Sequence, residues 1–245
     1  MIKPELNCDL GESFGIFSIG NDQEILPFVD AINIACGFHA GDPHTMKQTI
    51  QLAKQHNVHI GAHPGFQDIQ GFGRRRINLS SEEVYDLVLY QIGALYGFTK
   101  VEDVTLHHVK PHGALYNIAS SDKEIALAIA QAVYDFDKSL ILYGLANSFI
   151  TRAGEQIGLK VAHEVFADRT YQSNGTLTDR TSENAVIHDL DRSMQQVEEM
   201  MKTGHVTSID GQKIPIQADT ICVHSDTTKA LTYVKHLKQF ITQLN

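Results

Sequence analysis

The sequence of 245 residues has no tryptophan and only three cysteines, and its acidic residues outnumber its basic ones by 29 to 20. The formal net charge of −9 argues against a nucleic-acid surface, which needs clustered lysine and arginine. No apolar run approaches the roughly 18 residues of a membrane span, and the first residues lack a signal-peptide pattern. Cys8, Cys36 and Cys222 fit reduced core thiols better than a disulfide framework. We therefore expect a cytoplasmic protein that binds neither nucleic acid nor membrane.

Several motifs that define enzyme classes are also absent. Without G-x-x-x-x-G-K-[ST], no P-loop holds a nucleotide, and G-x-G-x-x-G and H-E-x-x-H do not occur either. The sequence instead has 13 histidines, more than its 11 phenylalanines or 8 tyrosines. Because histidine serves acid–base chemistry and metal binding near neutral pH, this excess points toward chemistry of those kinds.

Seven short apolar-rich segments predict strands, and patterns typical of helices separate most of them. The predicted strands are 5–10, 31–35, 58–62, 105–109, 139–143, 160–165 and 220–224. The predicted helices are 43–56, 81–96, one that begins at Ser121, 148–157, 185–202 and 227–243, with a hairpin over 206–216. Ser80 and Ser121 each begin a capping-box pattern. This alternation implies parallel strands in one domain over residues 1–245, as either an open doubly wound sheet or a closed barrel.

Polar side chains follow the predicted strands, at the edge where both architectures build active sites. Asp9 and Glu12 follow the first strand, where they suit metal binding or acid–base catalysis, or alternatively form a turn and a solvated surface. His39 follows the second strand between glycines that expose its imidazole. Asp42 precedes Pro43 and is expected to cap the next helix instead.

The later strands are followed by further such groups. His63 follows the third strand, and the glycine-rich loop beyond it carries Arg74 and Arg75, which form either a clamp on an anionic group or a solvated basic turn. Lys110 and His112 follow the fourth strand, where burial is costly unless the side chains are paired or used. The last two strands end in candidates for acid, base or anion-binding roles: Asp168, Arg169, His224 and Asp226.

The histidines divide by their predicted positions. Four follow strands and are the functional candidates: His39, His63, His112 and His224. Four lie within strands and are expected to be hydrogen-bonded structural residues: His59, His107, His108 and His163. Five lie on helices or turns and are expected to be solvated: His44, His56, His188, His205 and His236.

The strand-end motifs, taken in order, resemble those of the LamB/YcsF family. They are LNCDLGESFG at 6–15, NIACGFHAGDP at 33–43, GAHPGF at 61–66, GFGRR at 71–75, VKPHGALYN at 109–117, FADR at 166–169 and ICVHSD at 221–226. Ser225 departs from the glycine of the family's last motif. The resemblance implies a (β/α) barrel-like fold, related to glycoside hydrolases and carbohydrate deacetylases, with about seven parallel strands.

The resemblance further implies the A subunit of an ATP-dependent 5-oxoprolinase that works with subunits B and C. That activity cleaves 5-oxo-L-proline to L-glutamate, with ATP as a co-substrate that yields ADP and phosphate. We expect Asp9, with Glu12 or His39, to supply the base, and His63 or His112 to supply the proton. Lys110 is the remaining catalytic candidate and is placed to hold an anion. The expected substrate- and anion-binding residues are Arg74, Arg75, Asp168, Arg169, His224 and Asp226.

Two other functions remain open. A metal-dependent amide or carbohydrate deacetylase-type hydrolase would need no ATP and would hold a divalent ion among Asp9, His39 and His63. A non-catalytic subunit would only bind substrate for its partners, although the density of acid–base groups argues against it. Spacing alone does not decide, because the candidate ligands come from separate strands.

Overall fold

The strands of this chain close into a barrel. In the computed structural model, which describes residues 4–223 and 230–243, seven parallel strands pair in the order β1-β2-β3-β4-β5-β6-β9, and β9 returns to β1. The barrel strands are β1 (Glu5–Leu10), β2 (Ala31–Ala35), β3 (His59–His63), β4 (Leu106–Val109), β5 (Ile141–Leu145), β6 (Lys160–Phe166) and β9 (Thr220–Val223). The predicted seven-stranded barrel is therefore confirmed over the open doubly wound sheet.

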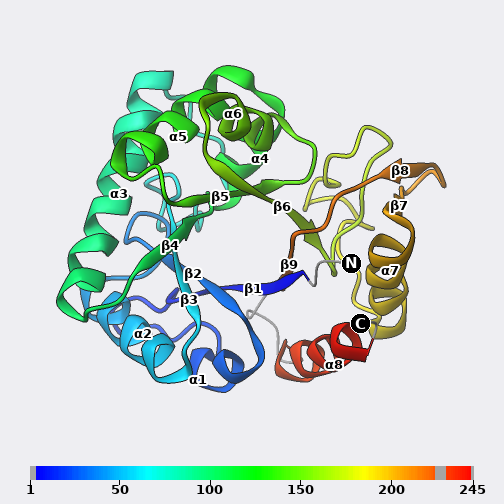
Figure 1. The fold of residues 1–245 in the computed structure, drawn as a ribbon, viewed down its shortest axis with the longest axis horizontal. Coiled ribbons are helices and arrows are strands. Elements are labelled where there is room, and N and C mark those ends of the chain that lie inside the picture. The colour runs from blue at the N-terminus through cyan, green and yellow to red at the C-terminus, as the bar shows by residue number, and fades with distance from the viewer. Residues whose placement is uncertain (1–3, 224–229, 244–245) are drawn as a thin grey trace.

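Helices surround the barrel on its outside (Figure 1). They are α1 (Asp22–Ile25), a 3-10 helix (Leu26–Phe28), α2 (Pro43–His56), α3 (Ser81–Val101), α4 (Gly113–Ser121), α5 (Lys123–Phe136), α6 (Phe149–Ile157), α7 (Leu190–Thr203) and α8 (Ala230–Gln243). The sequence pattern did not predict α4, and α7 begins at residue 190 rather than at 185. Residues 167–189 instead form a long loop after β6.

The two predicted capping boxes have different outcomes. The Ser80 side chain accepts a hydrogen bond from the Glu83 N–H, and the Glu83 carboxylate accepts one from the Ser80 N–H, which confirms the first box. The second prediction is wrong, because Ser121 is the last residue of α4. Asp122 caps α5 instead, and its carboxylate accepts two backbone N–H groups of the first turn.

The predicted hairpin is confirmed as a small separate sheet. Strands β7 (His205–Thr207) and β8 (Lys213–Pro215) pair antiparallel. Gly211, in the turn between them, has a φ of 82°, a conformation that glycine adopts without strain. The last barrel strand is described over Thr220–Val223. The predicted strand residue His224 lies outside the described residues.

The interior of the barrel is polar rather than aliphatic. On β1, Leu6, Cys8 and Leu10 are fully buried, while the alternating Asn7 and Asp9 point into the barrel, as the two-residue period of a strand requires. The fully buried polar groups of the neighbouring strands join them there: Asn33, His108 and Glu164. Such groups are stable only when hydrogen bonds satisfy them, so the barrel requires an internal polar network.

The three cysteines are free and buried, as the sequence predicts. Burial raises the pKa of Cys36 to about 12 and raises the pKa of Cys8 and of Cys222 well above the ordinary thiol value. A thiol in this state is a poor nucleophile, because the thiolate is the reactive form. The cysteines are therefore core residues rather than catalytic ones.

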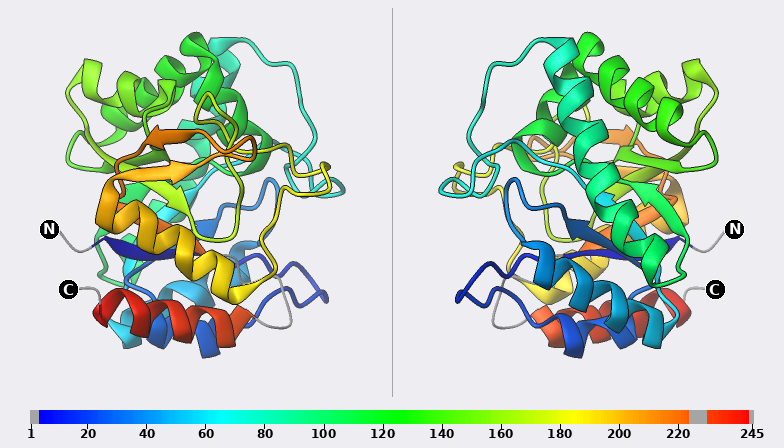
Figure 2. Two further views of the ribbon diagram at one scale, coloured as in Figure 1. Left: turned by 90° about the vertical axis from the view of Figure 1, so that its right-hand side faces the viewer. Right: turned by 90° about the vertical axis from the view of Figure 1, so that its left-hand side faces the viewer.

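Long loops gather at the carboxyl ends of the strands. Figure 2 shows the loop after β3, in cyan, and the loop after β6, in yellow, extending from the same end of the barrel. No helix within residues 4–223 and 230–243 is long and apolar enough to span a membrane. The loops place the motifs that follow separate strands around a single opening.

The corrected cap of α5 can be tested by its effect on stability. We expect Asp122→Ala to lower the free energy of unfolding by about 1 kcal/mol, because two N–H groups of the first turn lose their acceptor. Urea denaturation measures the difference. Ser121→Ala is the matched control, since the Ser121 hydroxyl bonds only to carbonyls of α4. A larger loss for Ser121→Ala than for Asp122→Ala would contradict the assignment.

Candidate active site

A cavity of about 780 Å³ opens at the carboxyl ends of the strands. Strand-end residues line its inner part: Asp9, Glu12, His63, Lys110 and His112. Basic and hydroxyl side chains of the loops also line it. Arg74, Arg76, Arg180 and Thr181 are exposed or half-buried, whereas Arg169 and Thr178 are buried. Most of the predicted candidates thus face one space, which has an acid–base floor and a basic rim.

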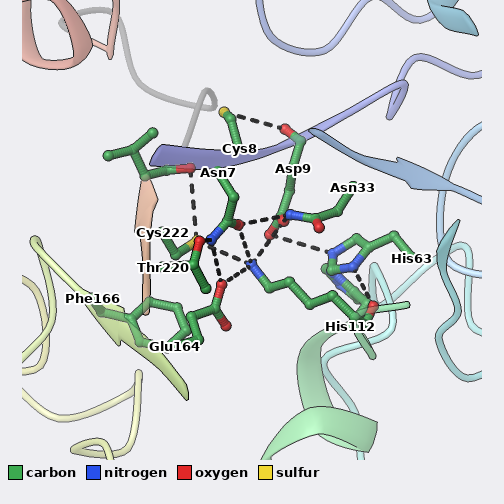
Figure 3. Close-up of polar contacts among 12 residues, drawn as sticks. Asn7, Cys8, Asp9, Asn33, His63, His112, Glu164, Phe166, Thr220 and Cys222 are labelled. Carbon is green, nitrogen blue, oxygen red and sulfur yellow. Dashed lines mark hydrogen bonds and ion pairs between the residues drawn. The ribbon is translucent and has the colours of Figure 1, made fainter. Parts of the chain in front are cut away.

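Lys110 is the centre of the floor. Its ammonium lies 3.0 Å from Asp9 Oδ1 and 2.8 Å from Glu164 Oε1, and it also reaches Asn7 Oδ1 and Cys222 Sγ (Figure 3). Burial alone would lower the pKa of Lys110, but the charges of Asp9 and Glu164 hold it well above its ordinary value. An ammonium has three donors, and protein acceptors surround this one. Lys110 therefore fixes the position of Asp9.

Two asparagines complete the hydrogen-bond network around Lys110. Asn33 Nδ2 donates to both Asn7 Oδ1 and Asp9 Oδ1 at 2.8 Å, and Asn7 Nδ2 donates to Glu164 Oε1 at 3.0 Å. His108 Nε2 in turn lies 2.7 Å from Asn33 Oδ1, which can only accept. The Asp9 carboxylate is consequently held by hydrogen bonds from two strands besides its own.

Glu164 is a functional candidate that the sequence reasoning missed. It is fully buried on β6, two positions before the strand ends, and it pairs with Lys110 across the barrel. Burial of the neighbouring Tyr116, and secondarily the charge of Glu164, raise the pKa of Tyr116 well above the ordinary value. The signal in the sequence was the single acidic residue of this strand, which lies next to the apolar Val165 and Phe166 and needs a cation when it is buried.

His63 and His112 meet beside Asp9. His63 Nδ1 lies 2.7 Å from the Lys110 carbonyl and His112 Nε2 lies 2.8 Å from the Phe72 carbonyl, so each of these nitrogens carries a hydrogen and donates it. The opposite nitrogens, His63 Nε2 and His112 Nδ1, face each other at 3.0 Å. His63 Nε2 also lies 3.3 Å from Asp9 Oδ2. The lone pairs of His63 Nε2 and His112 Nδ1 therefore point to one region, next to the Asp9 carboxylate.

His39 packs against this pair. Its ring stacks on that of His112 with centroids 3.8 Å apart. The prediction that its imidazole is exposed is wrong, because the ring is 1% exposed. Burial, together with the neighbouring imidazoles, lowers the pKa of His39 and of His112 well below the ordinary value. Neither nitrogen of His39 has a hydrogen-bond partner within the described part of the chain.

Glycines make room for these rings. A Cβ at Gly65 would come within 2.6 Å of His39 Nδ1, and one at Gly73 within 2.7 Å of His39 Cβ. A Cβ at Gly61 would overlap the His108 ring. Gly73 also has a φ of 63°, which glycine adopts most readily. The glycine-rich motifs therefore serve close packing around the imidazoles.

The arginine candidates have different surroundings. Arg74 is exposed and lines the cavity. Arg75 forms an ion pair with Asp68 and is not among the residues that line the cavity. The buried Arg169 donates to the carbonyls of Ala185 and Thr178, which orders the loop after β6 at the cavity wall.

Asp42 caps α2 as expected, with its carboxylate accepting the Thr45 N–H at 2.8 Å. Asp168 is half-buried at the start of the long loop and is not among the cavity-lining residues. His224 and Asp226 lie outside the described residues.

The other histidines mostly match their expected surroundings. His108 and His163 are buried and hydrogen-bonded. His59 is exposed, yet it pairs with Glu5 at 3.0 Å and stacks on His107. These three residues form a separate cluster at the amino ends of the strands. Four of the residues predicted to be solvated are exposed, whereas His205 is half-buried. The exposed four are His44, His56, His188 and His236.

The fold and the site define a parallel (β/α)-type barrel with an acid–base centre at the carboxyl ends of its strands. The model of the LamB/YcsF family matches residues 4–245, and the chain belongs to this family. The chain is 58% identical over 239 residues to the A subunit of 5-oxoprolinase from Bacillus cereus (strain Q1), covering 97% of this chain and 94% of the relative. It is 55% identical over 242 residues to the A subunit of 5-oxoprolinase from Staphylococcus carnosus (strain TM300), covering 99% and 96%.

A solved structure shares the whole fold. The crystal structure of the lactam utilization protein from Thermus thermophilus superposes with a TM-score of 0.92 at 44% sequence identity. The match covers 99% of this chain and 97% of that one. The barrel is therefore shared with this relative.

The ion pairs of Lys110 predict that losing the cation destabilises the fold more than losing one of its two carboxylate partners. We expect Lys110→Ala to lower the free energy of unfolding by about 3–5 kcal/mol, because it leaves Asp9 and Glu164 buried without their cation. Glu164→Gln should cost less, since Lys110 keeps Asp9 as a partner. Urea denaturation compares the two variants. Equal or reversed losses would show that Lys110 does not organise the site.

Proposed function

We propose that this chain opens the ring of 5-oxo-L-proline to give L-glutamate, as the A subunit of an ATP-dependent 5-oxoprolinase with subunits B and C. The observation that carries this proposal is the Asp9–His63–His112 group, held by Lys110 at the floor of the cavity. The names of the relatives support the substrate class, since they refer to 5-oxoprolinase and to lactam utilization. The whole-chain match supports a shared activity.

The reaction requires groups that this site contains. A lactam resists hydrolysis because its amide is resonance-stabilised and because the opened amino acid recloses readily. Hydrolysis of ATP to ADP and phosphate makes the overall conversion favourable, and phosphorylation of the lactam oxygen makes C5 electrophilic. Water then loses a proton as it adds to C5, and the ring nitrogen gains one as the C5–N bond breaks. The resulting acyl phosphate is hydrolysed by a second water to L-glutamate and phosphate. The site therefore needs a base and an acid close together.

Asp9 is placed to act as the base. Its Oδ1 is occupied by Lys110 and Asn33, while its Oδ2 lies toward His63 Nε2 at 3.3 Å. The hydrogen bonds at Oδ1 keep the carboxylate in one orientation, which favours proton transfer at Oδ2. Glu12 lines the same cavity and is the second carboxylate at the floor.

The histidine pair is placed to move the second proton. His63 Nε2 and His112 Nδ1 lie 3.0 Å apart, so a proton that His63 receives from the side of Asp9 has His112 as its next acceptor. His112 lines the cavity and can return that proton to the leaving nitrogen. The backbone carbonyls of Lys110 and Phe72 fix the orientation of both rings throughout.

The basic rim suits the anionic parts of the reactants. Arg74, Arg76 and Arg180 line the outer cavity, where they can contact a carboxylate or a phosphate. Arg75 is assigned a different role from the one predicted, because its ion pair with Asp68 closes the loop that carries Arg74.

The base assignment can be tested by turnover. With purified subunits B and C and with ATP, we expect Asp9→Asn to lower the rate of glutamate formation on the order of 10²–10⁴-fold, because the amide cannot take a proton from water. The matched control is Asp42→Asn, which changes a helix cap outside the cavity. A folded Asp9→Asn variant with a near-normal rate would refute the assignment. Turnover by this chain alone without ATP would instead favour the ATP-independent hydrolase.

The rim assignment predicts a difference between neighbouring arginines. We expect Arg74→Ala to raise KM for the anionic reactants about tenfold, since one cationic contact is worth roughly 1.5–3 kcal/mol. Arg75→Ala should raise KM less, because its guanidinium already pairs with Asp68. Steady-state kinetics measures KM for both variants, and thermal melting follows the stability of the loop. Equal effects on KM would contradict the proposed roles.

A further inference from the structure

Four potential metal ligands converge at the floor of the cavity. One ligand atom each from Glu12, His39, His63 and His112 lies within 4.8 Å of the others, and all four residues are buried. Three of them also line the cavity, so the cluster is accessible from it. The predicted metal candidates were Asp9, His39 and His63; the structure groups Glu12 and His112 with the two histidines, with Asp9 beside them.

The hydrogen bonds fix which nitrogens are available. The Lys110 carbonyl accepts from His63 Nδ1 and the Phe72 carbonyl accepts from His112 Nε2. A histidine that binds a metal typically donates its other N–H to a carbonyl in this way. His63 Nε2 and His112 Nδ1 are left as lone-pair donors 3.0 Å apart. Two ligands about 2.0–2.1 Å from one ion stand roughly 3 Å from each other.

His39 adds an independent observation. It is 1% exposed, and in the described ranges neither of its ring nitrogens has a hydrogen-bond partner. A buried imidazole without partners is costly, and its neighbours here are further nitrogen lone pairs rather than donors. Imidazole lone pairs lie in the ring plane, so His39 must turn out of its stack on His112 before one cation can accept electron pairs from all three rings. A cation bound in that way would remove this cost.

The donor set indicates the class of ion. Three imidazoles and one carboxylate suit Zn²⁺ and similar divalent transition metals, whereas Mg²⁺ prefers oxygen ligands. We infer that Glu12, His39, His63 and His112 bind one divalent transition-metal ion of the zinc class. This inference rests on the proposed function for the ion's role, which would be to lower the pKa of a bound water near Asp9. With the ion bound, His63 Nε2 and His112 Nδ1 are ligands, so the proton for the leaving nitrogen would come from that water through Asp9 and not through the histidine pair.

Metal binding can be measured without turnover. The full chain is stripped with a chelator, dialysed and titrated with Co²⁺, whose visible absorption reports nitrogen coordination, and then with Zn²⁺ by calorimetry. We expect one equivalent of either ion per chain and no displacement by a large excess of Mg²⁺. Failure to bind either ion stoichiometrically would overturn the inference. It would leave ring opening by Asp9 untouched, because that is judged by glutamate formation.

Variants locate the ion. His39→Gln removes no hydrogen bond described for His39, so the variant is expected to fold and to lose affinity by more than the roughly 10–100-fold typical of changing a residue that only supports a ligand. Glu12→Gln should also weaken binding. His59→Gln is the matched control, because His59 belongs to the separate cluster with Glu5 and His107. Circular dichroism confirms that each variant is folded. Metal binding that is retained in both His39→Gln and Glu12→Gln would overturn the assignment, and so would loss of metal binding in His59→Gln.

Discussion

The structure depends on the burial of one ammonium group inside a closed barrel. Lys110 is 2% exposed, and an ion this far from water is stable only against opposite charge and hydrogen-bond acceptors. That requirement dictates the acidic residue on β1, the acidic residue on β6 and the asparagines between them, which come from three different strands. The polar interior, the orientation of Asp9 and the floor of the cavity all follow from satisfying this one cation.

The geometry of the proposed catalytic groups is fixed largely by the backbone. The carbonyls of Lys110 and Phe72 set the tautomers of His63 and His112, and neither carbonyl depends on a side chain that substitution could change. The Lys110 carbonyl belongs to the same residue whose ammonium holds Asp9. One residue therefore positions the carboxylate through its side chain and an imidazole through its main chain, which couples the two halves of the site.

Much of the fold and part of the site could be predicted from the sequence. Alternating strand and helix patterns are local, and the carboxyl ends of parallel strands meet at one edge, so Asp9, His63 and Lys110 were predicted together. Glu164 was missed because its role depends on a partner across the barrel, which no local pattern encodes. Arg75 was assigned to the cavity because the sequence does not reveal its pairing with Asp68. The cap at Asp122 was displaced by an unpredicted helix that ends at Ser121.

The glycines that pack against imidazoles have a consequence for how this site can change over time. At Gly61 and Gly65 the ring of a histidine fills the volume that a side chain on the glycine would take. No other residue therefore fits at either position for as long as the neighbouring histidine is present. Loss of the histidine must come first along any viable path of substitutions, and only then can the glycine acquire a side chain. The order of mutational steps, and not only their identity, is thus imposed by packing in this barrel.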